Sequence, residues 1–458
     1  MNNAADVETK QLPQIEKIQV YGARWVVLGI FVLYSMSNAM QWVQFSIIND
    51  VVVSYYGVSS MWVDWTSMIY MILYIPFVFP ASYLLEKLGL RKAVIIGMTI
   101  NCIGTWIKVG AVDKDRFYVA FVGQTIVGFA QIFILAVPAR LAALWFGPSQ
   151  VSSACSIGVF GNQLGIAAGF LFPPIFVNSE SSHDEQTTQF YTMFIAVAAF
   201  TTVLLVIVLF FFKDRPPTPP SHAALQQSGE EFDFIGSLKS LMKNKSFVLL
   251  LLSYGINVGV FYAISTLLNQ IVLFYYPGAS ADAGRIGLVI IVAGMLGSVC
   301  CGIVLDKYHK FKETTLVVYG FSLISMVVYT FTLSKGIYVV YVISALLGFF
   351  MTGLLPVGFE LAAELTYPAP EGTSSGLLNC ACNLFGIAFT NIYSVIFNQV
   401  NDVWANIVMC IVLLVGVVLL IFTGSDLRRQ AAQRFELLVN AIIRSFLASL
   451  ENHQVTPN

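Results

Sequence analysis

The sequence predicts an all-α membrane protein with twelve transmembrane helices, arranged as two pseudo-symmetric six-helix bundles. Its 458 residues are 57% hydrophobic and only 11% charged, whereas about a quarter of the residues of a soluble domain are charged. Most of its surface must therefore face lipid. The chain contains twelve apolar stretches, each close to the roughly 20 residues that a helix needs to cross a bilayer. Its two halves also share residues at a nearly constant offset, which is the sign of an internal repeat.

The apolar stretches and the polar segments between them define the domains. We expect spans at 25–51, 60–85, 93–111, 117–140, 150–174, 189–212, 246–273, 285–306, 314–333, 337–360, 373–398 and 403–423. The halves are then 25–212 and 246–423, after an N-terminal tail at 1–24. Residues 213–245 form one long polar stretch with a proline-rich run at 216–220, which indicates a linker between the halves. Residues 424–458 form an amphipathic C-terminal segment that either lies on the membrane surface or ends in solvent.

Basic residues predict that both termini and the linker are cytoplasmic. Cytoplasmic loops of membrane proteins carry an excess of Lys and Arg. Of the 24 lysines and arginines in this chain, all but five fall on the side of the termini. The five on the outer side are Lys108, Lys114, Arg116, Arg285 and Lys335. The sequence therefore predicts a multi-pass protein with both ends in the cytoplasm.

Two pairs of residues mark the internal repeat most clearly. Trp42 in the first span lies 220 positions before Tyr262 in the seventh, and Arg140 closing the fourth span lies 220 positions before Glu360 closing the tenth. We expect Trp42 and Tyr262 to face each other across the pseudo-twofold axis. Arg140 and Glu360 are candidates for an ion pair that bridges the halves and gates the inner side. The alternative is that each bonds separately to nearby backbone.

The loops after the second and eighth spans carry related charges. The first contains Glu86-Lys87 and, after a glycine, Arg91, and the second contains Asp306-Lys307. These motifs resemble the signature of the major facilitator superfamily, in which the two halves rock around a central site and these loops latch the inward side. The resemblance implies a gating role for Glu86, Arg91, Asp306 and Lys307. The alternative is that the charges only follow the bias of cytoplasmic loops toward basic residues.

The predicted spans contain amides and aromatic rings where charges are scarce. No Asp or Glu lies near the middle of a span, and all four histidines fall in loops or the tail. Proton-coupled carriers need a titrating group inside the membrane, so this absence favours a uniporter. Asn38 and Trp42 fall on one face of the first span, at a helical spacing of four residues. The other candidates for a binding site are Phe261, Tyr262, Gln163 and Asn383.

These residues suit two different roles. Amides in membrane helices hold neighbouring helices together, at roughly 1 kcal/mol per hydrogen bond. They also line polar cavities, and the aromatic pair favours this second role. An aromatic face attracts an organic cation by roughly 0.5–2 kcal/mol per ring, and a quaternary ammonium group needs no hydrogen-bond acceptor. Gln163 or Asn383 would then bond a hydroxyl group attached to the cation.

Longer stretches resemble one particular family. The sequences at 41–44, 160–166, 261–269, 284–288, 312–319 and 364–368 are similar to the feline leukaemia virus subgroup C receptor family, and the similarity covers about residues 22–430. The resemblance implies facilitated transport of choline and ethanolamine across the plasma membrane. It implies an aromatic cage of Trp42 and Tyr262, with Gln163 as its first amide. The family's second glutamine is replaced by Asn383, one methylene shorter, which implies a wider pocket or a bridging water.

Other functions are weaker alternatives. The same family includes haem exporters, but no histidine and no central basic residue lies in a span to hold the iron or the propionates. Ligation of haem by cysteine or tyrosine stays open, and so does another small organic amine. No constellation of a nucleophile and a base indicates an enzyme, and the short outer loops argue against a receptor without transport. We expect no catalytic residue, metal site or cofactor. The expected partners are a small solute and the lipid bilayer, and the net charge of −1 gives no sign of nucleic-acid binding.

Overall fold

The computed structural model is helical throughout most of the residues that it describes. These are residues 19–428 except 136, 148, 149, 221–232 and 370, together with a few isolated positions after 428. Eleven of the described helices are long and apolar enough to cross a membrane, and α1 is a shorter apolar helix. The predicted all-α fold with twelve membrane helices is therefore confirmed. The predicted amphipathic segment at 424–458 lies largely outside the described residues.

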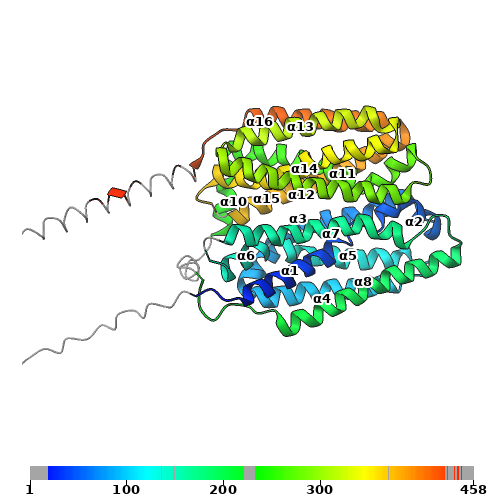
Figure 1. Ribbon diagram of the computed structural model, residues 1–458, viewed down its shortest axis with the longest axis horizontal. Helices are drawn as coiled ribbons and strands as arrows, with labels where there is room; N and C mark the ends of the chain where they lie inside the picture. Colours follow the sequence, from blue (N-terminus) through cyan, green and yellow to red (C-terminus); the bar gives the residue numbers. More distant parts are fainter. Residues whose placement is uncertain are drawn as a thin grey trace, which may run out of the picture.

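The helices lie side by side in two groups, one from each half of the chain (Figure 1). The first group consists of α1 (Ala23–Ala39), the short η1 (Ser46–Ile48), α2 (Asn49–Tyr56), α3 (Ser60–Leu88), α4 (Leu90–Val109), α5 (Phe117–Leu135), α6 (Val137–Trp145), α7 (Val151–Phe176) and α8 (His183–Phe211). The second consists of α11 (Lys245–Tyr275), α12 (Ser280–Tyr308), α13 (Phe311–Thr332), η2 (Leu333–Lys335), α14 (Ile337–Thr366), α15 (Glu371–Gln399) and α16 (Asp402–Ile421).

The predicted linker contains a helix that the sequence analysis did not identify. This helix, α10 (Phe234–Lys243), packs against α11 and α15. It begins where the Asp233 side chain accepts a hydrogen bond from the Gly236 amide at 3.0 Å, as an N-cap residue does. It lies at the same end of the bundle as the start of α1 and the end of α16, which we call the linker end. The opposite, distal end carries α2 and the connection between α7 and α8 (Figure 1).

The first predicted span, 25–51, is not a continuous helix. α1 ends at Ala39, residues 40–45 are non-helical, and helical geometry resumes in η1 and α2. The expectation that Asn38 and Trp42 share one helix face is therefore wrong, because Trp42 lies in the break. Residues 40–48 contain neither proline nor glycine, which are the usual local causes of a helix break. The cause must lie in the residues that surround this segment.

The two groups of helices meet along α3 and α15, along α7 and α12, and where α11 touches η1 and α2. Glycine allows the backbones to approach closely, as is typical between membrane helices. A Cβ atom on Gly287 of α12 would lie 2.4 Å from the Phe170 ring of α7, and one on Gly284 would lie 2.5 Å from the Phe170 carbonyl oxygen. These contacts join the end of α7 to the start of α12, so they lie at the distal end.

The buried apolar side chains form clusters that differ between the distal end and the linker end. The largest cluster draws residues from both halves, and those from the first half come from its distal parts at 39–71, 111–127 and 166–194. Near the linker end, the first half has a cluster of its own that includes Phe31, Leu141 and Trp145. A continuous core therefore joins the halves at the distal end, whereas this linker-end cluster is confined to the first half.

Replacing Gly348 by alanine is expected to destabilise the second half. Gly348 of α14 faces α12, where an added Cβ would lie 2.3 Å from the Ile290 carbonyl oxygen, and overpacking of this kind costs about 1–3 kcal/mol. Gly320→Ala in α13 is the matched control, because nothing lies within 4 Å of the position that its added methyl group would take. Thermal melting of purified protein should show a lower midpoint for Gly348→Ala alone. Equal midpoints for the two variants would contradict this account of the α12–α14 interface.

Candidate functional site

Trp42 and Tyr262 are in contact where the two halves of the chain meet. Their ring centroids lie 5.4 Å apart and the ring planes are inclined by 70°. Trp42 is buried in the non-helical segment at 40–45, and Tyr262 is half-buried on α11. An added Cβ on Gly386 of α15 would lie 2.9 Å from the Tyr262 ring and 3.0 Å from the sulfur of Met71 on α3. The ring pair therefore lies at the junction of the helix break with α3, α11 and α15.

The other predicted binding residues are placed as follows. Phe261 is buried on α11 beside Tyr262, with their ring centroids 6.1 Å apart. Gln163 is half-buried on α7, and its side-chain oxygen is buried without a hydrogen-bond partner. Asn383 on α15 is 8% exposed and donates a hydrogen bond to the Asn379 carbonyl oxygen at 2.8 Å. Each of these residues belongs to a helix that contacts the opposite half.

Asn38 has a position typical of a helix-packing residue. It is fully buried, and its amide nitrogen donates to the Asn101 side chain on α4 at 3.0 Å and to the Val127 carbonyl oxygen on α5 at 2.9 Å. Both contacts lie within the first half. Of the two roles weighed for the membrane amides, this geometry favours helix association for Asn38.

At the distal end, hydrogen bonds connect the halves directly. Asp50 at the start of α2 accepts from the Asn269 amide of α11 at 3.0 Å and from the Ser280 hydroxyl of α12 at 2.8 Å. Asp64 on α3 accepts from the Gln270 amide of α11 at 2.7 Å. We call Asp50, Asp64, Asn269, Gln270 and Ser280 the distal network. A hydrogen bond contributes about 0.5–1.5 kcal/mol, so this network holds the two halves together at the distal end.

In the sequence these carboxylates lie near span ends, a position that predicts no particular role. The only relevant signal was the offset of 220 positions between Asn49 and Asn269. In the structure these two asparagines do not make equivalent contacts. Asn49 accepts from Ser60 at 2.8 Å within the first half, whereas Asn269 crosses to Asp50 and to the Ile47 carbonyl oxygen. The offset between equivalent positions therefore does not indicate which residues are partners in this network.

The predicted gating residues at the linker end are only partly described. The side chains of Glu86 and Asp306 lie outside the described residues. Arg91 is exposed, and its backbone amide donates to Asp214 at 3.0 Å while its guanidinium donates to the Leu209 carbonyl oxygen at 2.8 Å. These bonds tie the turn between α3 and α4 to the end of α8 and to the first residues of the linker. Lys307 lies over the ring of the neighbouring Tyr308.

Arg140 and Glu360 are not joined by an ion pair in this structure. The ion pairs among the described residues lie within loops or single helices, at 113–116, 214–215 and 282–285. Arg140 is half-buried on α6, where its Nε atom is buried without a hydrogen-bond partner. Glu360 is exposed on α14 and has interactions of its own. A gate formed by this pair would require a different arrangement of the linker end.

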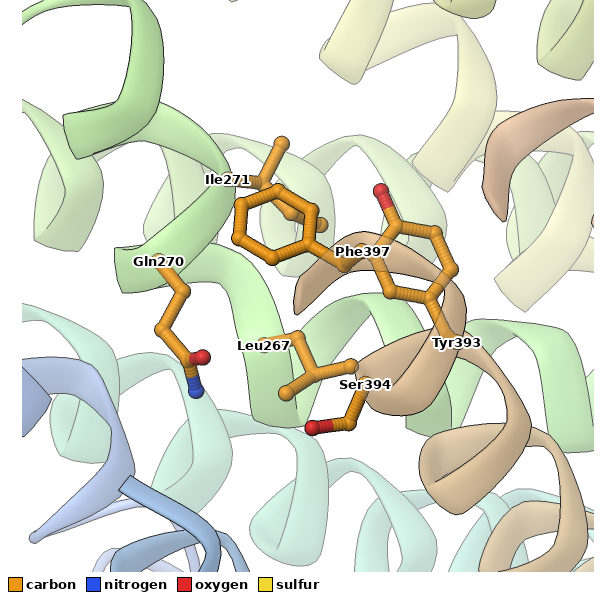
Figure 2. A pocket seen from close by; sticks show the side chains of 6 residues that line it. All are labelled: Leu267, Gln270, Ile271, Tyr393, Ser394 and Phe397. Carbon is orange, nitrogen blue, oxygen red and sulfur yellow. The ribbon is translucent and has the colours of Figure 1, made fainter. Parts of the chain in front are cut away.

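Two cavities lie away from the aromatic pair. One is a small space between α11 and α15, lined by Leu267, Gln270, Ile271, Tyr393, Ser394 and Phe397 (Figure 2). It has no room for a water-sized molecule, and Figure 2 shows the Gln270 amide turned away from the two aromatic rings. The other, of about 220 Å³, lies within the first half between Met40, Gln44, α7 and α8. Neither cavity includes Trp42 or Tyr262.

Comparison with known proteins identifies the class of protein that has this fold. The family model of the Major Facilitator Superfamily matches residues 27–391. Among solved structures, a bacterial homologue of the human lysosomal transporter Spinster superposes with a TM-score of 0.66 at 12% identity, covering 89% of this chain and 98% of that one. The fucose:proton symporter of E. coli superposes with a TM-score of 0.61 at 13% identity, covering 88% of this chain and 98% of that one. The chain is a multi-pass membrane transporter of the major facilitator superfamily.

Curated relatives narrow the assignment to one family. The chain is 48% identical to the choline/ethanolamine transporter flvcr2a of Danio rerio over 94% of both chains. It is 48% identical to the choline/ethanolamine transporter FLVCR2 of Homo sapiens, covering 91% of this chain and 80% of that one. It is 47% identical to the choline/ethanolamine transporter FLVCR1 of Felis catus, covering 89% of this chain and 74% of that one. The chain therefore belongs to the feline leukaemia virus subgroup C receptor family, which confirms the resemblance found in its sequence.

Proposed function

We propose that this protein carries choline, and also ethanolamine, across the plasma membrane by facilitated uniport. The observation that carries the proposal is the contact between Trp42 and Tyr262 across the two halves. The two ring planes are inclined by 70°, and a rounded cation placed in the angle between them would face both π surfaces. Each ring would contribute about 0.5–2 kcal/mol to holding an ammonium group. The naming of close relatives as choline/ethanolamine transporters supports the same substrate class.

Gln163 and Asn383 would bind the hydroxyl end of the same substrates. Choline and ethanolamine each carry one hydroxyl group two carbons from the nitrogen, so a site for both needs a polar partner beside the cage. The buried, unpartnered oxygen of Gln163 is available to accept a hydrogen bond from such a hydroxyl group. Asn383 is the second amide of the proposed site, and its nitrogen already bonds within its own helix. Phe261 would add apolar surface beside Tyr262.

Transport by alternating access would use the two halves as rigid units around this site. The proposed units are 25–212 and 246–423, joined by the linker at 213–245, with the segments 1–24 and 424–458 outside them. The closed distal end supports this proposal, because it is held by the hydrogen bonds of the distal network. The excess of basic residues at the linker end supports a cytoplasmic location for that end and an extracellular distal end. This structure would then be closed toward the outside.

The location of the carboxylates and histidines supports uniport. The buried carboxylates Asp64, Glu364 and Asp402 lie toward helix ends, and the described histidines lie outside the middle of the spans. Transport driven by a proton gradient would need a carboxylate or histidine that takes up and releases a proton within the membrane. The substrate gradient alone would then set the direction of transport.

Radiolabelled choline uptake into liposomes containing the purified protein tests this proposal. We expect saturable uptake that unlabelled ethanolamine inhibits and that choline inside the vesicles accelerates by exchange. An imposed pH gradient should not drive accumulation above the outside concentration, and such accumulation would contradict uniport. A well-folded protein that carries no choline would contradict the substrate assignment. Haem, or another small organic amine, would then be the next substrate to test.

A further inference from the structure

Lys108 is a buried lysine with an environment that its position in the sequence did not indicate. Its place in the sequence predicts a basic residue on the outer side, but in the structure it is 1% exposed near the distal end of α4. Its ammonium group donates to the side-chain oxygens of Gln41 and Gln44, both at 3.0 Å, and lies 5.5 Å from the centre of the Phe45 ring. Among the described residues it forms no ion pair with a carboxylate.

The two glutamines that bind Lys108 flank Trp42 in the helix break. Gln41 and Gln44 are 0% and 3% exposed, so their side chains point into the protein rather than toward lipid. Thr105, one turn before Lys108 on α4, also bonds the Gln41 side chain. The ammonium group thus ties both ends of the segment 41–44 to α4. This arrangement restrains the backbone that carries the Trp42 ring.

Gln124 on α5 supports the same segment from another direction. It is fully buried, and its amide nitrogen is within hydrogen-bond distance of the carbonyl oxygens of Gln41 at 2.8 Å, Trp42 at 3.4 Å and Thr66 at 3.0 Å. A helix break inside a membrane protein leaves backbone carbonyl groups without their usual partners, and these groups must be satisfied by protein side chains. Gln124 supplies a donor to two of them and links the break to α3 through Thr66.

We infer that Lys108 and Gln124 are positioning residues, which create the break at 40–45 and hold the Trp42 ring against Tyr262. The inference rests on the proposed function, in which Trp42 binds the substrate cation. It explains why a segment without proline or glycine leaves helical geometry: its side chains and carbonyl groups have buried polar partners on α4 and α5. A buried polar group is retained only where it is hydrogen-bonded, and the amine of Lys108 donates to two glutamine oxygens.

The test is choline uptake by Lys108→Met and Gln124→Leu, with the wild type measured first. Both changes keep the approximate size of the side chain and remove its hydrogen-bond donors. We expect KM for choline to rise about tenfold or more, with the maximal rate per transporter changed much less. Lys114→Met is the matched control, because Lys114 is exposed in the loop after α4, and its KM should equal that of the wild type. Gln44→Met removes one of the two acceptors of the Lys108 hydrogen bonds, and it should raise KM by an intermediate amount. It replaces Lys108→Met in the experiment if that variant does not fold.

Combination with Trp42→Phe separates positioning of the ring from general damage. If Lys108 acts through Trp42, the double variant should have a KM within about twofold of the more impaired single variant, because coupled positions are not additive. An unchanged KM with a reduced maximal rate, or fully additive effects in the double variant, would overturn the inference. A wild type that carries no choline would instead contradict the proposed function, so the two failures are distinguishable.

Discussion

Replacing Trp42 by alanine is expected to reduce choline uptake to near the level of protein-free liposomes. The substitution removes a ring that faces the proposed cation site, and it also removes the contact that orients Tyr262. A tryptophan face can contribute about 2 kcal/mol to binding a desolvated cation, which corresponds to roughly thirtyfold in affinity. Initial rates of radiolabelled choline uptake, measured over a range of concentrations, would reveal this as a large rise in KM.

Two further variants define what such a loss would mean. Trp42→Phe keeps an aromatic face and should retain part of the uptake. Trp404→Ala removes a tryptophan that is 57% exposed on α16, far from the ring pair in sequence and on another helix, and it should transport like the wild type. Undiminished uptake by well-folded Trp42→Ala would rule out the aromatic cage. Equal losses in Trp42→Ala and Trp404→Ala would point to a general effect of removing an indole ring.

Replacing Asp50 by alanine is expected to open the distal end. The change removes the acceptor of the hydrogen bonds from Asn269 and Ser280, and at about 1.5 kcal/mol each their loss shifts the balance between conformations by roughly a hundredfold. A cysteine placed at Thr266, which is fully buried and bonds Ser67 of the opposite half, reports the opening. A membrane-impermeant maleimide added on the distal side should label this cysteine at least several times faster in the Asp50→Ala background.

The exposed carboxylate Asp115, in the loop between α4 and α5, provides the comparison for this experiment. Asp115→Ala removes a negative charge from the same end of the molecule without breaking a contact between the halves. The introduced cysteine in the Asp115→Ala, Thr266→Cys protein should be labelled at the same rate as in the Thr266→Cys protein without a change at Asp115. If both aspartate variants label at the same rate, the distal network does not control access.

Much of the fold follows from the sequence, because each membrane helix carries its own signal. A run of about 20 apolar residues needs no knowledge of its neighbours to be recognised, and the spans expected at 60–85 and 246–273 correspond to α3 and α11. The helix break at 40–45 was not predicted, because it depends on residues elsewhere in the chain. Its apolar and polar spacing also fits a continuous helix, and the groups that stabilise the break, on Lys108 and Gln124, lie more than 60 residues away.

Some contacts of the candidate site could be predicted from the sequence and others could not. The internal repeat predicted that Trp42 and Tyr262 face each other, because duplicated halves place equivalent positions on either side of a pseudo-twofold axis, and the rings are in contact. No comparable rule relates Asp50 to Ser280 or Asp64 to Gln270. Those contacts depend on how far the two halves have closed at one end, which is a property of the conformation rather than of either half alone.

The interrupted first span also has a consequence for how the protein is synthesised. α1 contains 17 residues, which at ~1.5 Å per residue gives about 26 Å, less than the roughly 30 Å of the hydrocarbon layer. It leaves the ribosome before α4 and α5 exist, when neither the Lys108 ammonium group nor the Gln124 amide is available to the segment at 40–45. The break in the first span therefore lacks these stabilising contacts until α5 has been inserted. The first helix to be made therefore reaches its final shape only after α5 is in place.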